Sequence, residues 1–271
     1  MKAIISYDRN NEEMEEDSMK PVIVRNVNIG EGMPKICVPI VGKTEEEILQ
    51  MAKEIVNVPA DLVEWRVDWY ESVLEMQKVV ELSKELREIL GEMPLLFTFR
   101  TKAEGGELEL GTKPYAMLNK LMIASGHIDL VDVEVFAAEK EVASIVETAH
   151  KYGVKVVGSN HDFAKTPDKE EIVRRLSYMQ SIGVDIPKIA VMPQNRRDVL
   201  TLLEATEEMV SQHADRPIVT MSMSQIGTVS RLAGEVFGSA ITFGALGKTS
   251  APGQIPVVEL KKMLEIMHKE L

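Results

Sequence analysis

The stretch KICVPIVGKTEEEILQMAKEIV, residues 35–56, joins a short apolar run to a segment of helical spacing through Gly42. The first half is rich in β-branched residues, which is typical of a strand buried on both faces. In the second half Ile48, Ala52 and Ile55 recur every three or four residues, as on one face of an amphipathic helix. The stretch therefore predicts one β-strand followed directly by one helix.

The same strand-and-helix unit recurs along the rest of the chain, with helical stretches such as DKEEIVRRLSYMQSIG at 168–183. Because crossovers between parallel strands are right-handed, eight such units in 271 residues favour a closed barrel over an open sheet. We therefore predict an α/β fold in which residues 20–271 form a single (β/α)8 TIM barrel. Its strands are expected at 35–42, 61–68, 94–100, 128–136, 154–160, 186–193, 217–223 and 239–245.

The residues before the first barrel strand fall into two parts. Residues 1–19 contain the acidic tract NNEEMEEDS and have almost nothing to bury, so we expect a disordered acidic tail there. The segment PVIVRNVNIGEGMP, residues 21–34, shows short alternation followed by glycines, which favours a β-hairpin ahead of the barrel.

The composition excludes several classes of partner. With 31 Lys and Arg against 43 Asp and Glu, the net charge of -12 repels nucleic acid and anionic membrane surfaces. The single cysteine, Cys37, cannot form an internal disulfide. No apolar run approaches ~18 residues and no signal region opens the chain, so we expect a cytoplasmic protein that does not enter a membrane.

In a (β/α)8 barrel the active site lies at the C-terminal ends of the strands, so polar residues there are candidates for function. Strand 61–68 alternates, with Trp65 and Val67 on the face expected to meet the helices and a charged face toward the lumen. That charged face is either a structural ion-pair layer or a polar wall for a hydroxylated substrate. Charged residues of both signs converge on this mouth from three strands: Glu64, Arg66, Asp68, Arg100, Asp132 and Glu134.

His161 is the leading candidate for proton transfer. The chain has five histidines, and this one alone sits at the catalytic end of a predicted barrel strand. Imidazole changes its charge near neutral pH, which suits a general acid and base. A structural histidine with satisfied hydrogen bonds is the alternative.

Lys188 lies inside the apolar strand IPKIAVMP, residues 186–193. Alternation places it on one face with Ala190 and Met192, and a lumen position would put its amine in a low-dielectric pocket near arginines. Such a setting favours the free amine, which is the form that attacks a ketone to give a Schiff base. The alternative is a buried ion pair of Lys188 with Glu64, Asp132 or Glu134.

Two other kinds of site are excluded by spacing. No HxxxH, HExxH or paired-cysteine motif is present, so we expect no metal. GALGKT, residues 244–249, resembles part of a phosphate loop, but Thr242 stands where that motif needs its first glycine.

Six segments together give the chain a close resemblance to the type I 3-dehydroquinate dehydratase family, from about residue 35 to the C-terminus. The segments, in the order found in the family, are EWRVD (64–68), LLFTFR (95–100), SNHDF (159–163), PKIAVMP (187–193), SRLAGEVFGSA (230–240) and SAPGQI (250–255). The resemblance implies a lyase that converts 3-dehydroquinate to 3-dehydroshikimate in aromatic amino acid biosynthesis. It implies no cofactor, and it suggests a homodimer.

The resemblance also implies the role of each site residue. Lys188 would form an imine with the substrate ketone, His161 would be the general acid and base, and Glu104 would orient His161. The residues implied to bind substrate are Glu64, Arg66, Arg100, Arg231, Ser250 and Gln254, and those implied to line the pocket are Met221, Met223 and Phe243.

Two other functions compete with this one. A class I aldolase would also use a lysine on the sixth strand, but the surroundings of His161 and Arg231 suit a carboxylate without a phosphate. A catalytically silent barrel that only binds a metabolite or a partner chain would be favoured by loss of Lys188 or His161, and both are present.

Overall fold

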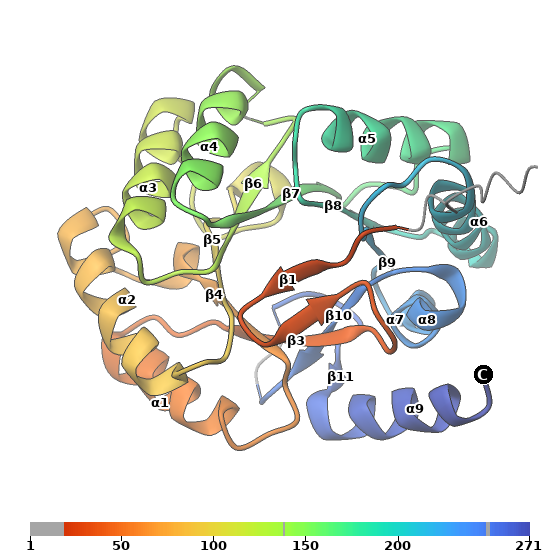
Figure 1. The fold of residues 1–271 in the computed structure, drawn as a ribbon, viewed down its shortest axis with the longest axis horizontal. Helices are drawn as coiled ribbons and strands as arrows, with labels where there is room; N and C mark the ends of the chain where they lie inside the picture. The colour runs from red at the N-terminus through yellow and green to blue at the C-terminus, as the bar shows by residue number, and fades with distance from the viewer. Residues whose placement is uncertain (1–18, 138, 248–249) are drawn as a thin grey trace, which may run out of the picture.

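A closed ring of parallel strands forms the centre of the protein (Figure 1). The computed structural model describes residues 19–137, 139–247 and 250–271. Each strand pairs with the next along the chain, so the prediction of a (β/α)8 barrel is confirmed. The barrel strands are β3 (Lys35–Ile40), β4 (Leu62–Arg66), β5 (Leu95–Thr98), β6 (Leu130–Glu134), β7 (Lys155–Asp162), β8 (Ile186–Val191), β9 (Val219–Ser222) and β10 (Ile241–Ala245).

The ring closes between β9 and β10 through a parallel bridge of Ile218 with Ser239. Seven of the eight barrel strands are shorter than predicted, and only β7 extends further, to Asp162. The predicted strand 61–68 ends at Arg66 and turns into the 3-10 helix η1 (Val67–Trp69), and β5 ends before Arg100. The Arg100 backbone N–H donates to the Asp68 carboxylate instead of to a neighbouring strand.

Helices surround the ring on its outside (Figure 1). Each barrel strand is followed by helix, and two short helices, α7 and α8, occupy the position after β9. The helices are α1 (Glu45–Ile55), α2 (Met76–Leu90), α3 (Thr112–Ser125), α4 (Glu139–Lys151), α5 (Lys169–Ser181), α6 (Arg196–Gln212), α7 (Thr228–Leu232), α8 (Gly234–Phe237) and α9 (Val257–Lys269), with the 3-10 helix η2 (Lys102–Glu104) after β5. A two-residue strand that was not predicted, β11 (Ile255–Pro256), pairs with the end of β10.

Alternation along the strands separates two apolar clusters. Trp65, Phe97 and Ile189 pack between the sheet and the helices. Leu62 and Ala190 belong to a second cluster inside the ring. The alternation read from the sequence therefore assigns the inner and outer faces correctly, and Lys188 shares the inner face with Ala190 as predicted.

The predicted hairpin is present as antiparallel β1 (Val22–Val24) and β2 (Val27–Ile29). Its buried residues Val22, Val24 and Ile29 join the inner cluster, so the hairpin covers the N-terminal end of the barrel. The predicted acidic tail falls almost entirely outside the described residues. With the N-terminal end covered, a ligand must enter from the C-terminal end.

Near the starts of the strands, four short polar side chains each join one strand to its neighbour by a hydrogen bond. Asp61, Asp129 and Asp185 each precede an even-numbered strand and accept a backbone N–H from the strand before it, at 2.7, 2.9 and 2.9 Å. Ser239, which precedes β10, accepts the backbone N–H of Thr220 at 3.0 Å in the same way. These four contacts fix the register of β3 with β4, β5 with β6, β7 with β8, and β9 with β10.

Candidate active site

A pocket opens at the C-terminal end of the barrel, as the fold predicts. The space between its walls, including the part open to solvent, is about 460 Å³. All twelve residues predicted for the site line this one pocket: Glu64, Arg66, Arg100, Glu104, His161, Lys188, Met221, Met223, Arg231, Phe243, Ser250 and Gln254.

Lys188 projects from β8 into the pocket and is 4% exposed. Its Nζ lies 3.6 Å from Asp132 Oδ2 and 4.0 Å from Glu64 Oε1, and it stands 4.5 Å from the centroid of the Phe243 ring. Of the three partners left open by the sequence, Asp132 and Glu64 are near the amine, while Glu134 is taken by Arg100. Both contacts are longer than a hydrogen bond, so charge attraction holds the amine without a tight partner.

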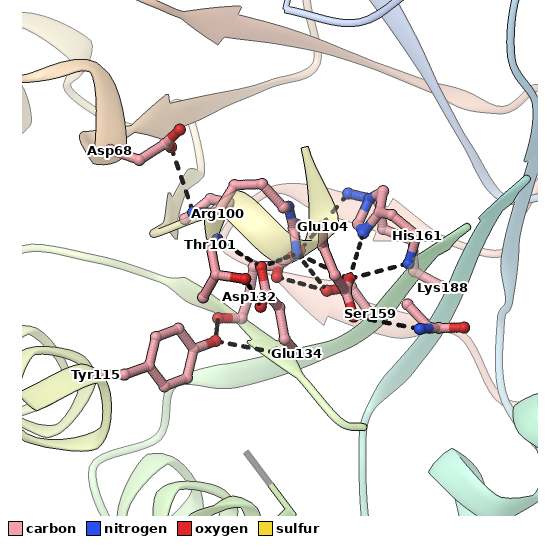
Figure 2. Close-up of polar contacts among 12 residues, drawn as sticks. Asp68, Arg100, Thr101, Glu104, Tyr115, Asp132, Glu134, Ser159, His161 and Lys188 are labelled. Atoms are coloured by element: carbon pink, nitrogen blue, oxygen red, sulfur yellow. Dashed lines mark hydrogen bonds and ion pairs between the residues drawn. The ribbon is translucent and has the colours of Figure 1, made fainter. Parts of the chain in front are cut away.

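His161 and Glu104 form a close pair beside Lys188 (Figure 2). Glu104 Oε2 lies 2.8 Å from His161 Nδ1 and accepts the His161 backbone N–H at 2.9 Å. Because Nδ1 is occupied, Nε2 is the ring nitrogen left for a ligand. Glu104 comes from η2 in the loop after β5, whereas His161 is on β7, two residues beyond Ser159, which pairs with Lys188.

Burial controls the protonation of this pair. It raises the pKa of the Glu104 carboxyl to about 8, although the guanidinium of Arg100 acts in the opposite direction. Burial, together with the positive charges of Arg100, Lys188 and Arg66, lowers the pKa of the His161 imidazole well below its usual range. Above pH of about 8 the pair therefore consists of a carboxylate and a neutral imidazole that keeps its proton on Nδ1.

Arg100 is the centre of a buried polar network (Figure 2). Its guanidinium lies 2.8 Å from Asp132 and 3.0 Å from Glu134, and it donates to Ser159 Oγ at 2.9 Å. Burial alone would lower the pKa of Arg100, but these two carboxylates raise it well above the ordinary value. Arg100 thus lines the pocket with most of its donors already engaged.

Arg66 is also paired, since it makes two 2.8 Å hydrogen bonds to the carboxylate of Asp68. Asp68 lies on η1 rather than on the predicted strand, and it also receives the backbone N–H groups of Arg100 and Glu107. The buried charges therefore include a structural ion-pair layer, one of the two readings left open by the sequence, and this layer forms the wall of the pocket.

Arg231 differs from the other two arginines because it makes no ion pair within the described part of the chain. Its Nη2 donates to the Pro252 carbonyl at 3.0 Å, and its Nη1 lies 3.9 Å from Met221 Sδ. Its buried Nε has no hydrogen-bond partner among the residues that the structure describes. Burial lowers the pKa of the Arg231 guanidinium to about 10. A buried, unpaired guanidinium that lines a pocket is suited to receive an anion, above all a carboxylate.

Ser250 and Gln254 complete the pocket wall after β10. The Gln254 side chain accepts the Ser250 backbone N–H at 2.9 Å and donates to Ser250 Oγ at 3.0 Å. Both side chains are half-buried and present polar atoms to the pocket.

Four pocket residues were not predicted: Gly105, Phe163, Ala190 and Ala251. Gly105 and Ala251 adjoin the predicted site residues Glu104 and Ser250. Ala190 shares the inner face of β8 with Lys188, so alternation could have identified it. Phe163 could not be placed from sequence, because β7 ends at Asp162 and the chain then leaves the sheet.

The described part of the chain contains neither a metal site nor a membrane-spanning helix. Among residues 19–137, 139–247 and 250–271, no group of three or more His, Cys, Asp and Glu side chains is placed to hold a metal ion. In the same ranges no helix combines the length and apolar character needed to cross a bilayer.

The fold and its pocket define a barrel enzyme that carries a buried lysine beside a histidine–glutamate pair. A family model described as type I 3-dehydroquinase matches residues 36–270. The chain therefore belongs to the type I 3-dehydroquinase family.

Known proteins of this family resemble the chain over nearly its whole length. The 3-dehydroquinate dehydratase of Listeria welshimeri is 56% identical over 252 residues, which is 93% of this chain and 100% of that protein. The 3-dehydroquinate dehydratase of Clostridioides difficile is 54% identical over 252 residues, which is 93% of this chain and 99% of that protein. A crystal structure of type I 3-dehydroquinate dehydratase from Clostridium difficile with covalently modified comenic acid matches with a TM-score of 0.91 at 53% identity, covering 93% of this chain and 100% of that one.

Proposed function

We propose that this protein dehydrates 3-dehydroquinate to 3-dehydroshikimate through an imine on Lys188. The observation that carries the proposal is the position of the buried Lys188 amine, which has no tight partner among the described residues and faces the same pocket as the His161–Glu104 pair. Family membership and the high identity to named 3-dehydroquinate dehydratases support this substrate.

The reaction begins at the ketone. The Lys188 amine adds to C3, and the carbinolamine loses water to give an iminium ion. The iminium draws electrons from the adjacent C2–H bond, so this carbon becomes acidic. In this scheme the lysine supplies the electron sink, and no metal or organic cofactor is needed.

His161 then moves one proton from carbon to oxygen. Its Nε2 removes the C2 proton, and the electron pair forms an enamine. The enamine expels the C1 hydroxyl, which takes the proton from the imidazolium and leaves as water. Hydrolysis of the conjugated imine returns Lys188 and releases 3-dehydroshikimate, so the net change is the loss of one water.

The remaining residues bind and orient the substrate. Arg231 holds the carboxylate through its free donors, since it is the cation in the pocket without a carboxylate of its own among the described residues. Polar groups of β4 and of the segments after β5 and β10 contact the ring hydroxyls: Glu64, Arg66, Arg100, Ser250 and Gln254. The apolar side chains Met221, Met223 and Phe243 exclude water from the reacting carbons.

Borohydride trapping tests the proposal. Reduction in the presence of 3-dehydroquinate should attach the ligand to the peptide that contains Lys188, and K188M should block both labelling and formation of the conjugated enone. Enone formation without a Lys188 adduct would contradict the imine. Binding without enone formation would favour the silent barrel, and cleavage of a carbon–carbon bond would favour the aldolase.

Three further points stay predictions: the cytoplasmic location, the homodimer and the use of the reaction in aromatic amino acid biosynthesis.

A further inference from the structure

A chain of hydrogen bonds leads from a helix outside the barrel to Glu104. Arg175 on α5 donates from Nη1 to Asn160 Oδ1 at 2.9 Å. Asn160, on β7, donates from Nδ2 to Glu104 Oε1 at 3.2 Å. The other oxygen of Glu104 contacts His161, so four side chains connect the outer helix layer to the reacting histidine.

The two ends of the Asn160 amide have opposite chemistry. Oδ1 only accepts hydrogen bonds and the NH2 group only donates them. Since a guanidinium has donors alone, Arg175 must face Oδ1, and this turns the NH2 group toward Glu104. A donated hydrogen bond favours the carboxylate form of Glu104 over the protonated form. Arg175 thus decides which end of the amide meets Glu104.

Arg175 is held firmly enough to impose this orientation. Its Nε donates to Glu171 Oε1 at 2.7 Å, one turn earlier on the same helix. The guanidinium carbon lies 5.9 Å from the centroid of the Phe136 ring, and the side chain is 21% exposed. Arg175 does not line the substrate pocket, so any effect on the reaction must pass through Asn160.

We propose that Arg175 and Asn160 are positioning residues that favour the ionised form of Glu104 as a hydrogen-bond acceptor, so that His161 presents Nε2 as a base. This inference rests on the proposed function, in which His161 Nε2 takes the C2 proton. An ionised Glu104 requires a proton on Nδ1 and leaves the lone pair on Nε2. A protonated Glu104 can donate to Nδ1 instead, which places the ring proton on Nε2 and removes the base.

Opposing effects act on the protonation of the Glu104 carboxyl, so the loss of one hydrogen bond should shift its pKa measurably. Burial raises the pKa of its carboxyl to about 8, and the bond from Asn160 acts in the opposite direction. Other charged groups around the pair come from β4, β6, β8 and the segment that follows β5. Arg100 favours the carboxylate, Glu134 and Asp132 oppose it, and Lys188 and Arg66 act on His161.

The adjacent Arg174 provides a matched control. It donates to Glu171 at 2.6 and 2.9 Å, as Arg175 does at 2.7 Å, but it does not contact Asn160. With R175M the acidic limb of the pH profile of kcat/KM should move up by about one pH unit. At a fixed pH below the limb, kcat/KM should therefore fall by about tenfold, and above the limb it should hardly change. R174M should leave the limb in place. An unmoved limb in R175M, or equal shifts in both variants, would overturn the inference.

Three more variants separate positioning from packing. N160L should give the same upward shift as R175M, and the double variant R175M/N160L should shift no further than N160L alone, because Arg175 acts through Asn160. R175K keeps a donor for Oδ1, so its acidic limb should lie between those of the unaltered enzyme and R175M. Additive shifts would show that Arg175 acts by another route.

A measurement without substrate keeps this inference apart from the proposed function. The ¹⁵N chemical shifts of His161 report which ring nitrogen carries the proton across a pH titration. The transition from Nε2–H to Nδ1–H should occur about one pH unit higher in R175M than in R174M. If the enzyme forms no enone, the proposed function fails while this titration still decides the role of Arg175. Identical titrations in the two variants would contradict that role.

Discussion

Glu104 Oε2 contacts His161 at two points, the backbone N–H at 2.9 Å and the ring Nδ1 at 2.8 Å. The backbone contact fixes where the carboxylate lies, and the ring contact uses that fixed position to set the orientation of the imidazole. A residue from a loop after β5 thereby sets the orientation of the imidazole on β7 in the pocket.

The first prediction concerns E104Q. Glutamine keeps the shape but cannot provide a charge-assisted hydrogen bond to Nδ1–H. Such a bond is worth ~1.5–3 kcal/mol, so kcat should fall by about 10- to 150-fold. Steady-state kinetics checks this, with KM as the companion readout. A large rise in KM with unchanged kcat would mean that Glu104 binds substrate instead.

The second prediction separates imine formation from proton transfer. H161A should lower kcat by about 10²- to 10⁴-fold, which is the usual contribution of a general acid or base. The variant should still form some borohydride-reducible adduct at Lys188, since the amine remains in place. Mass spectrometry of the reduced protein measures the adduct, and a rate close to that of the unaltered enzyme would remove His161 from its role.

The third prediction is a dependence of stability on pH. The Glu104 carboxyl is 6% exposed and has its folded-state pKa raised from 4.5 to about 8. The folded state therefore binds more protons than the unfolded state between these values. The stability from this group is fully present below about pH 4.5 and is lost as the pH rises through about 8.

E104Q removes this loss because glutamine does not ionise. Relative to the unaltered protein, the variant should gain more than about 1 kcal/mol in free energy of unfolding between pH 6 and pH 9. Urea denaturation at the two pH values measures the difference. Parallel pH dependences in the two proteins would show that Glu104 titrates near its ordinary value.

The fourth prediction tests the anion-binding role of Arg231. R231M should raise KM for 3-dehydroquinate by about tenfold or more, since it removes a charge-assisted bond to the carboxylate. A cyclic ketone without a carboxylate serves as the control substrate for adduct formation at Lys188, and its trapping should hardly change. Equal losses for both ligands would indicate a general disturbance of the pocket.

The fifth prediction concerns Gly105, which follows Glu104 and has φ of +85°. A Cβ atom there would lie 2.4 Å from the ring of Phe163. G105A should displace Phe163 and Glu104 and lower kcat/KM by about tenfold or more, because a small misplacement of a catalytic group is costly. The double variant G105A/F163A should recover part of the activity, and G91A is the control, since its φ is also positive and nothing lies within 4 Å. No recovery would assign the loss to backbone strain alone.

Much of this arrangement follows from alternation along the strands. It correctly placed Lys188, Glu64 and Arg66 on the inner face, because a strand that is buried on both sides offers only two directions for a side chain. It could not identify the charge nearest to Lys188, since Asp132, Glu64 and Glu134 all face inward.

Contacts made by loops and by the outer helix layer could not be predicted in this way. Glu104 lies in a loop, where no periodicity sets direction, and only the family resemblance pointed to it. The contact of Arg175 with Asn160 joins a helix to a strand fifteen residues earlier and depends on how α5 packs against the barrel. The predicted strand ends differ from the observed ones by up to two residues. After β5 the Asp68 carboxylate accepts the Arg100 backbone N–H, which would otherwise extend the sheet.

The four side-chain contacts that fix strand register at the covered end of the barrel also determine which side chains face the pocket at the open end. Ser159 pairs with Lys188 in the register of β7 with β8, and Asp185 helps to fix that register. A slip of one residue would turn Lys188 outward into the helix layer and bring Pro187 or Ile189 into the lumen. The position of the Lys188 amine in the pocket is therefore set at the opposite end of the barrel, by Asp185, which does not line the pocket.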